Sequence, residues 1–228
     1  MLCKIAELIT DVPEDLAKYC ADYLYTGSEA PVITIDPARY RRDPYPRGIL
    51  KESLSYMESA YQFYQGLIDH QGFYLHASAV ILDGGAYLFS GPCEVGKSTH
   101  ARIWCDTFPG AVIMNDDRPA LRCIDGVWYA YGTPWCGKEQ INRNMCAPVA
   151  GVCFLEQADH NAICPMPPAQ ALQAVMAQTM YKYGQPQQLD TMLNLLDHLL
   201  QNVPIYHLKN RPEAAAAILS KEAMEKAV

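Results

Sequence analysis

Apolar positions recur at steps of three and four residues from Ser53 to about His70, which is the spacing of an amphipathic helix with one buried face. The tyrosines of this helix are expected to pack in the core rather than to hold a metal or a cofactor. Similar patterns, punctuated by proline and glycine, predict the other helices. They are expected at Glu14–Tyr25, from Lys97 to about Phe108, and at Pro168–Tyr181, Leu189–Val203 and Pro212–Ala227.

Short apolar runs bounded by turn residues predict the strands. Phe73–Leu82 and Ala86–Ser90 flank Asp83-Gly84-Gly85 and should form a hairpin, and Pro119–Ile124 and Val127–Tyr131 flank Asp125-Gly126 in the same way. Further strands are expected at Pro31–Ile35, Ala111–Asn115, Val149–Leu155 and Ile205–Leu208. The pattern predicts an α/β protein that is rich in antiparallel pairs and differs from a repeated β-α-β array.

The length of 228 residues suits one α/β unit with an N-terminal appendage. Half of the residues are hydrophobic, which indicates an ordinary globular protein rather than a disordered or fibrous one. Residues 1–50 differ in composition and include the basic, proline-punctuated stretch Pro37–Arg47. We interpret them as a small N-terminal subdomain with a connector, and residues 51–228 as the main domain.

The formal charge of −7 has no compensating basic block. The densest basic cluster, Arg39, Arg41, Arg42 and Arg47, is too small for a nucleic-acid binder that works by neutralising phosphates. No signal peptide is predicted, and no apolar run reaches the roughly 18 residues of a membrane span, so we expect a cytoplasmic protein. Nine scattered cysteines never form C-x-x-C, which favours reduced, mostly buried thiols over a zinc site or a disulfide framework.

The run Gly91-Pro92-Cys93-Glu94-Val95-Gly96-Lys97-Ser98-Thr99 matches G-x-x-x-x-G-K-[ST], and it lies between a predicted strand and a predicted helix. In this motif the glycines let backbone N–H groups surround phosphates, and the N-terminus of the helix adds its dipole. Lys97 would neutralise β- and γ-phosphate charge, Ser98 would bind Mg²⁺, and Thr99 offers a second hydroxyl. The carboxylate of Glu94 either weakens nucleotide binding or points outward.

Two acids, Asp116 and Asp117, follow the predicted strand that ends at Asn115, and Asp116 is nineteen residues beyond Lys97. An acid at the end of a buried strand commonly completes a magnesium site with the hydroxyl of the loop. One carboxylate can therefore bind the cation while the other accepts a proton from an attacking hydroxyl. The competing interpretation is a pair of solvated turn or capping residues.

With these motifs, residues from about Phe73 to Leu155 resemble the HPr kinase/phosphorylase group and, more distantly, phosphoenolpyruvate carboxykinases. The shared features are His76 before the loop, the hairpin, the glycine-rich motif, and the short step to Asn115–Asp117. The group usually has a serine and a small residue where this chain has Cys93 and Glu94.

The resemblance implies a phosphoenolpyruvate carboxykinase-like fold, a mixed β-sheet with packed helices and a P-loop. It implies proton transfer and metal binding for Asp116 and Asp117, and a place near the phosphates for His76, which can also be a satisfied histidine at a strand end. The first fifty residues do not match the group's own N-terminal domain, so its protein substrate does not carry over. Small relatives beside genes for modified peptides imply a serine in a peptide as acceptor.

An irregular segment, Tyr131 to Lys138, contains Gly132, Pro134 and Gly137 around Trp135. Lys138 can steady a transferring phosphoryl group, and the alternative is a surface turn with a packed indole. Arg118 is expected to pair with the aspartates in preference to the substrate, and Arg143 is a weaker candidate for facing the site.

The leading hypothesis is an ATP- and Mg²⁺-dependent kinase domain in residues 51–228. It would transfer the γ-phosphoryl group to a hydroxyl, foremost that of a serine, in a small molecule, peptide or protein. The alternative, motivated by Glu94, is a nucleotide-binding regulatory or scaffold module without catalysis. Carboxykinase-type decarboxylation ranks last, because the additional residues that it requires are not found in the sequence. No partner nucleic acid or membrane is expected, and no oligomeric state is predicted.

Overall fold

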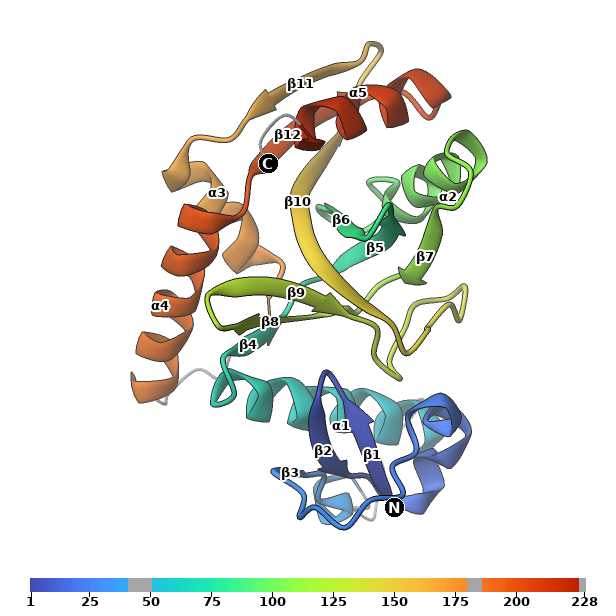
Figure 1. The fold of residues 1–228 in the computed structure, drawn as a ribbon, viewed down its shortest axis with the longest axis vertical. Helices are drawn as coiled ribbons and strands as arrows, with labels where there is room; N and C mark the ends of the chain where they lie inside the picture. The colour runs from blue at the N-terminus through green and yellow to red at the C-terminus, as the bar shows by residue number, and fades with distance from the viewer. Residues whose placement is uncertain (41–50, 180–185, 226–228) are drawn as a thin grey trace.

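The structure is a computed structural model that describes residues 1–40, 51–179 and 186–225. Its main sheet has the strand order β4-β8-β9-β10-β6-β5-β7, and β12 and β11 extend it beside β10 (Figure 1). The strands are β4 Gly72–Tyr74, β5 Ala77–Leu82, β6 Gly85–Ser90, β7 Val112–Asn115, β8 Ala120–Ile124, β9 Val127–Tyr131, β10 Cys146–Gln157, β11 Ala162–Pro165 and β12 Ile205–Asn210. The mixed α/β class that the sequence predicts is confirmed.

The long strand β10 joins the two halves of this sheet. Its first residues, Cys146 to Pro148, pair antiparallel with β9. Its later residues pair parallel with β6 on one side and with β12 on the other. Both predicted hairpins, β5–β6 and β8–β9, are present, with positive φ values at the Asp-Gly turns that connect them.

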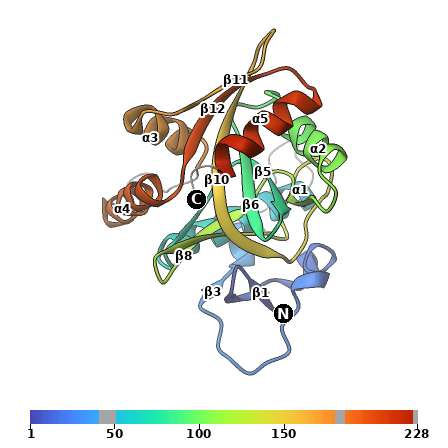
Figure 2. The same cartoon turned by 45° about the horizontal axis from the view of Figure 1, so that its top comes forward.

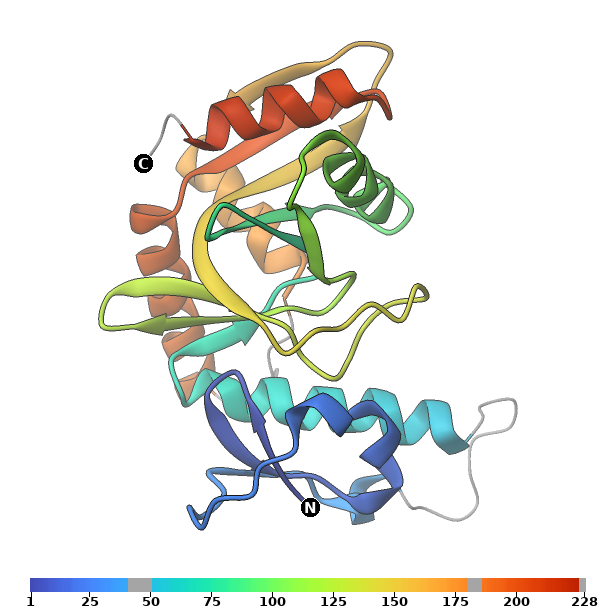
Figure 3. The ribbon, with the colours of Figure 1, turned by 45° about the vertical axis from the view of Figure 1, so that its right-hand side comes forward.

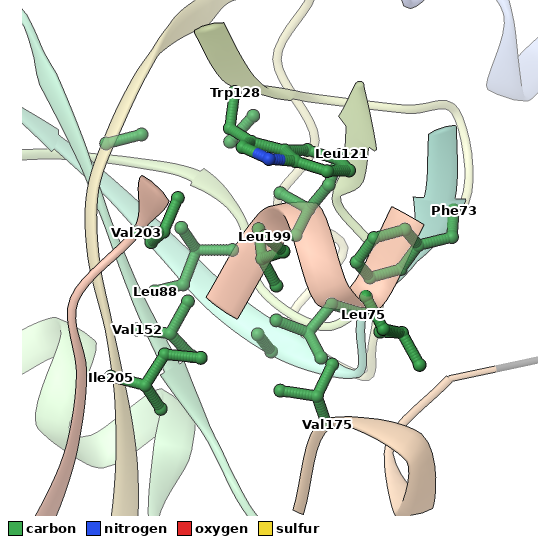
Figure 4. Close-up of a cluster of buried hydrophobic side chains, with 14 of the residues drawn as sticks. Phe73, Leu75, Leu88, Leu121, Trp128, Val152, Val175, Leu199, Val203 and Ile205 are labelled. Atoms are coloured by element: carbon green, nitrogen blue, oxygen red, sulfur yellow. The ribbon is translucent and has the colours of Figure 1, made fainter. Parts of the chain in front are cut away.

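Helices cover both faces of the sheet. They are α1 Lys51–Ile68, α2 Lys97–Thr107, α3 Pro168–Ala177, α4 Pro186–Asn202 and α5 Ala214–Glu225. Along β6, Leu88 belongs to the core under α3 and α4, whereas its neighbours Tyr87 and Phe89 belong to the core under α2 and α5. This alternation is the two-residue period of a strand that is buried on both faces. Figure 2 shows the two helix pairs on opposite sides of β10, and Figure 4 shows the core under α3 and α4.

The N-terminal residues form a second, smaller sheet of β1 Leu2–Ile5, β2 Leu8–Asp11 and β3 Ile33–Thr34. It packs on α1, which lies between this sheet and the rest of the molecule (Figure 3). The core formed there includes Phe63 and Tyr64 of α1 and also Trp135 from the loop after β9. The domain boundary at residue 50 stays a prediction, and Arg41, Arg42 and Arg47 lie outside the described residues.

Two predicted elements differ from the structure. The helix expected at Glu14–Tyr25 is wrong: the segment forms two 3₁₀ helices, η1 Glu14–Tyr19 and η2 Ala21–Tyr23, and η3 Pro37–Arg39 is a third. The chain leaves η2 because Tyr25 N–H donates to the Leu2 carbonyl, which draws this segment against β1. The strand expected at Phe73–Leu82 is two strands, since Leu75 and His76 donate their N–H groups to Pro119 and Gln178 instead of to a ladder.

The predicted helices and strands elsewhere are present with shifted ends. The sequence did not predict β1, β2 or β11. Residues 180–185 and 226–228, which include the predicted ends of two helices at Tyr181 and Ala227, lie outside the described residues. None of the helices in the described ranges is long and apolar enough to cross a membrane. A cytoplasmic location stays a prediction.

A buried histidine joins α2 to α5. His100 is 1% exposed, and its Nε2 lies 3.2 Å from Ser220 Oγ, which also accepts from Trp104 Nε1 and donates to the Ala217 carbonyl. Because the Ser220 proton is already donated, His100 Nε2 must carry the ring proton, and Nδ1 has no partner within the described structure. Burial lowers the pKa of His100 to about 4.

We expect the free energy of unfolding to fall as the pH drops from about 6.5 to about 4. In this window His100 is protonated in the unfolded chain but stays neutral in the folded protein. The loss should approach roughly 3 kcal/mol at most. His100→Gln should remove this pH dependence in urea unfolding at a series of pH values. His160→Gln, at an exposed histidine, is the matched control, and an unchanged slope in His100→Gln would contradict the assignment.

Candidate active site

The glycine-rich loop runs from the end of β6 to the start of α2. Gly91 and Gly96 have φ values of 136° and 106°, which L side chains rarely adopt, and a Cβ at Gly91 would lie 3.1 Å from the Val95 side chain. Glu94 also has a positive φ, 65°. The Lys97 ammonium folds back over the loop and donates to the carbonyls of Gly91 and Pro92, at 3.0 Å each.

One cavity of about 620 Å³ collects most of the predicted site residues. Those that line it are His76, Cys93, Glu94, Gly96, Lys97, Ser98, Thr99, Asp116, Asp117 and Lys138. Arg118, Cys136, Gly137 and Glu139 complete the lining, and Gly91, Pro92 and Val95 of the loop are not among the lining residues. Segments more than sixty residues apart in the sequence therefore meet at one hollow. Glu94 is exposed and is one of the lining residues.

Asp116 is 4% exposed and is held by the backbone of the loop after Trp135. Its Oδ1 accepts from Gly137 N at 2.7 Å, and its Oδ2 accepts from Glu139 N at 3.1 Å. Burial raises the pKa of Asp116, and the two backbone hydrogen bonds oppose this shift only in part. Gly137 is required for the close approach, because a Cβ there would lie 2.9 Å from Asp116 Oδ2.

Asp117 differs from its neighbour because its partners are the side chains of a histidine and an arginine. Its Oδ1 lies 3.0 Å from His76 Nε2, and its Oδ2 accepts from Arg118 Nε at 3.2 Å. Burial alone would raise the pKa of Asp117, but the hydrogen bond and charge of His76, together with Arg118, outweigh burial and lower it. The expected pairing of Arg118 with the aspartates is therefore present in the structure.

His76 is oriented by a residue that sequence reasoning missed. Its Nδ1 lies 2.9 Å from Gln178 Oε1, and its backbone N–H donates to the Gln178 carbonyl at 2.8 Å. Both ring nitrogens therefore have a partner, Gln178 at Nδ1 and Asp117 at Nε2. Gln178 directly follows α3 and carries no motif, so no signal in the sequence pointed to it.

Asn115 organises the backbone on which both aspartates stand, and it is fully buried. Its Oδ1 accepts from the N–H groups of Asp117 and Arg118, at 3.0 and 2.6 Å, as in an Asx turn. Its Nδ2 donates to the carbonyls of Thr133 and Trp135. Asparagine at the end of a buried strand is the local signal that could have identified this role.

The loop after β9 is fixed from the side opposite to Asp116 by α1. The Trp135 indole is 1% exposed and donates to Ser59 Oγ at 3.0 Å. It is therefore packed in the core, as in the alternative interpretation of this segment. Tyr56 OH accepts from Cys136 N at 2.6 Å. Lys138 nevertheless lines the cavity and is exposed, and its neighbour Glu139 forms an ion pair with Arg102 of α2.

Two further candidates are placed by their contacts. The Arg143 side chain donates to the Ile113 carbonyl at 3.1 Å and does not line the described cavity. Lys97 is 7% exposed, and burial lowers its pKa, while the charge of Asp117 acts in the opposite direction. No group of three or more His, Cys, Asp or Glu side chains in the described ranges could hold a metal ion.

The fold and the cavity together define a mixed α/β protein in which a glycine-rich loop opens a helix beside two unlike carboxylates. The chain belongs to the family described as SynChlorMet cassette protein ScmC, whose model matches residues 50–213. Among solved structures, the Hpr(Ser) kinase/phosphatase from Coxiella burnetii matches with 11% sequence identity and a TM-score of 0.37, over 68% of this chain and 95% of that one. The comparison with curated proteins found no match.

Replacing Asp117 by Asn should lower the free energy of unfolding at pH 7 by about 1–3 kcal/mol, because His76 and Arg118 lose their common anion. The pKa of Asp117 is lowered by folding, so its contribution is present above the ordinary carboxyl value of 3.8 and is lost as the pH falls through the folded-state value. The difference between wild type and variant should therefore close below about pH 4. Urea unfolding from pH 3 to 7 measures it. Asp69→Asn, at an exposed aspartate, should show no such difference, and a gap that stays constant with pH would contradict the ion pairs.

Proposed function

We propose that this protein is a kinase that transfers the γ-phosphoryl group of ATP to a hydroxyl, foremost that of a serine. The observation that carries the proposal is that the G-x-x-x-x-G-K-S loop, two carboxylates and a second lysine line one cavity. Phosphoryl transfer is promoted mainly by positioning and by stabilisation of negative charge, and these residue types supply both. We also propose that the fold is phosphoenolpyruvate carboxykinase-like.

The loop is suited to hold a triphosphate. Lys97 already reaches across it to the carbonyls of Gly91 and Pro92, and its ammonium needs only to turn toward the cavity to meet phosphate oxygens. The N-terminus of α2 begins at Lys97 and favours negative charge at the same place. Ser98 and one aspartate would hold Mg²⁺, which supplies further neutralisation of the phosphates when it is bound.

The unlike surroundings of the two aspartates suggest a division of labour. Asp116 has a raised pKa, and its carboxylate accepts two backbone N–H groups of the loop, so it is the better proton acceptor for an attacking hydroxyl. Asp117 is kept ionised by His76 and Arg118, which suits a ligand of a divalent cation. Lys138, which also lines the cavity, would stabilise the negative charge of the transferring phosphoryl group.

A second candidate function is nucleotide binding without catalysis. It is favoured by Glu94, an exposed acidic residue in the lining of a cavity that would hold a polyanion. Such a module would be stabilised by ATP but would show no turnover.

Transfer from γ-labelled ATP to hydroxyl acceptors, with Mg²⁺ present, tests the kinase proposal. Lys97→Met should lower kcat about 100-fold or more, because a charge that faces the transition state is lost. Asp116→Asn should lower kcat by a similar factor with little change in the KM for ATP, because the proton acceptor is lost. Asp117→Asn should instead raise the Mg²⁺ concentration that is required. Transfer that is unaffected by Lys97→Met and Asp116→Asn would overturn the proposal.

Cys93 provides a separate test of nucleotide binding, since it is exposed within the loop. At about ten times the Kd of Mg·ATP, its alkylation by iodoacetamide should slow roughly tenfold, because only the free protein reacts. Cys164 is exposed in β11, away from the cavity, and serves as the internal control in the same mass spectrum. Equal protection of Cys164, or no protection of Cys93, would contradict binding at the loop.

A further inference from the structure

A second cavity, of about 280 Å³, adjoins the first. The N-terminal segment contributes Lys18, Tyr19 and Asp22 to its lining, and α1 contributes Tyr56. Cys136 and Gly137 line both cavities. The second cavity therefore lies where the N-terminal segment, α1 and the loop after Trp135 meet.

Cys136 and Gly137 form the wall that the two cavities share. Tyr56 OH accepts from Cys136 N at 2.6 Å, on the side of the second cavity. Asp116 Oδ1 accepts from Gly137 N at 2.7 Å, on the side of the first. Two successive N–H groups thus hold the wall from opposite directions, and a molecule bound beside Tyr56 lies next to the peptide group that contacts Asp116.

The lining of the second cavity has the chemistry of a peptide-binding surface. Tyr19 and Tyr56 present rings whose centroids are 4.5 Å apart, and the carboxamides of Gln140 and Asn142 also line it. Tyrosine rings offer broad amphipathic contact area, and carboxamides hydrogen-bond to main-chain groups. Lys18 and Asp22 are exposed and of opposite charge, so they can select charged neighbours in a bound segment.

We propose that the second cavity is the acceptor subsite and that it takes a serine-bearing polypeptide segment, whose hydroxyl reaches past Gly137 to Asp116. This rests on the proposed kinase function. A small hydroxyl compound could be contained in the 620 Å³ cavity beside the nucleotide and would leave the surface formed by the N-terminal segment without a use. A polypeptide is long enough to occupy the second cavity and to place a serine side chain over the shared wall in the first.

The proposed transfer forms one P–O bond and breaks another. The serine hydroxyl gives its proton to the Asp116 carboxylate, and its oxygen forms the bond to the γ-phosphorus. The bond from that phosphorus to the oxygen bridging the β- and γ-phosphates breaks, and ADP leaves with the electron pair.

Charge reversal at the exposed lining residues tests the proposal. The probe is a degenerate library of serine-containing peptides, with free serine and glycerol as separate acceptors and γ-labelled ATP as donor. Lys18→Glu and Asp22→Lys should each raise the KM for peptides about tenfold and change the preferred charge beside the serine. The KM for ATP and the protection of Cys93 should stay unchanged. Asp159→Lys is the matched control, at an exposed aspartate between β10 and β11 that lines neither cavity.

The outcomes separate this inference from the function on which it rests. Peptide labelling that Lys18→Glu and Asp22→Lys alter no more than Asp159→Lys would overturn the subsite but leave the kinase standing. Labelling of free serine or glycerol alone would overturn the polypeptide acceptor. If ATP protects Cys93 but no acceptor is labelled, the kinase proposal itself fails and the inference fails with it.

Discussion

The Asp116 carboxylate is the interaction on which the candidate site depends. It receives two N–H groups from the loop after Trp135, and in this way it joins the end of β7 to a segment that has no regular structure of its own. A buried carboxylate must be hydrogen-bonded, and an irregular loop must be anchored, so each satisfies a requirement of the other. Gly137 permits the contact because any side chain there would collide with the carboxylate. Lys138 reaches the cavity because its neighbours Gly137 and Glu139 are both fixed to Asp116.

The same loop is fixed from behind, and this makes the N-terminal core part of the site. Trp135 is buried against α1, and Tyr56 of α1 bonds to the next residue along the loop. Substitutions that weaken the core beneath β1–β3 would therefore make the loop at the cavity more mobile, although no residue that lines the cavity is changed. The electrostatics follow from this arrangement. The fold brings Lys97, Arg118 and Lys138 to one cavity, and the same lining holds four acidic residues, Glu94, Asp116, Asp117 and Glu139.

The features that could be predicted from the sequence are those determined by residues close together in the chain. Asp-Gly turns identified both hairpins, and the strand–loop–helix context of the glycine-rich motif matches the structure because each signal lies within a few residues. The β1–β2 hairpin was missed because its turn uses Ala6 and Glu7, at φ values of 50° and 64°, in place of glycine. The break at His76 was missed because its apolar surroundings read as one continuous strand. Gln178 lies 102 residues from His76, and such a contact has no local signature.

The family match includes the whole lining of the larger cavity but only part of the lining of the smaller one. The matched residues, 50–213, contain every residue that lines the larger cavity, including the loop, both aspartates and Lys138. The residues that the N-terminal segment contributes to the smaller cavity, from Lys18 to Asp22, lie outside that match. The two cavities share Cys136 and Gly137, and Gly137 must stay a glycine because a Cβ there would lie 2.9 Å from Asp116 Oδ2. On the proposed function, such an arrangement lets the N-terminal segment determine which acceptor is bound, while Asp116 and the glycine-rich loop keep a fixed geometry on the other side of the shared wall.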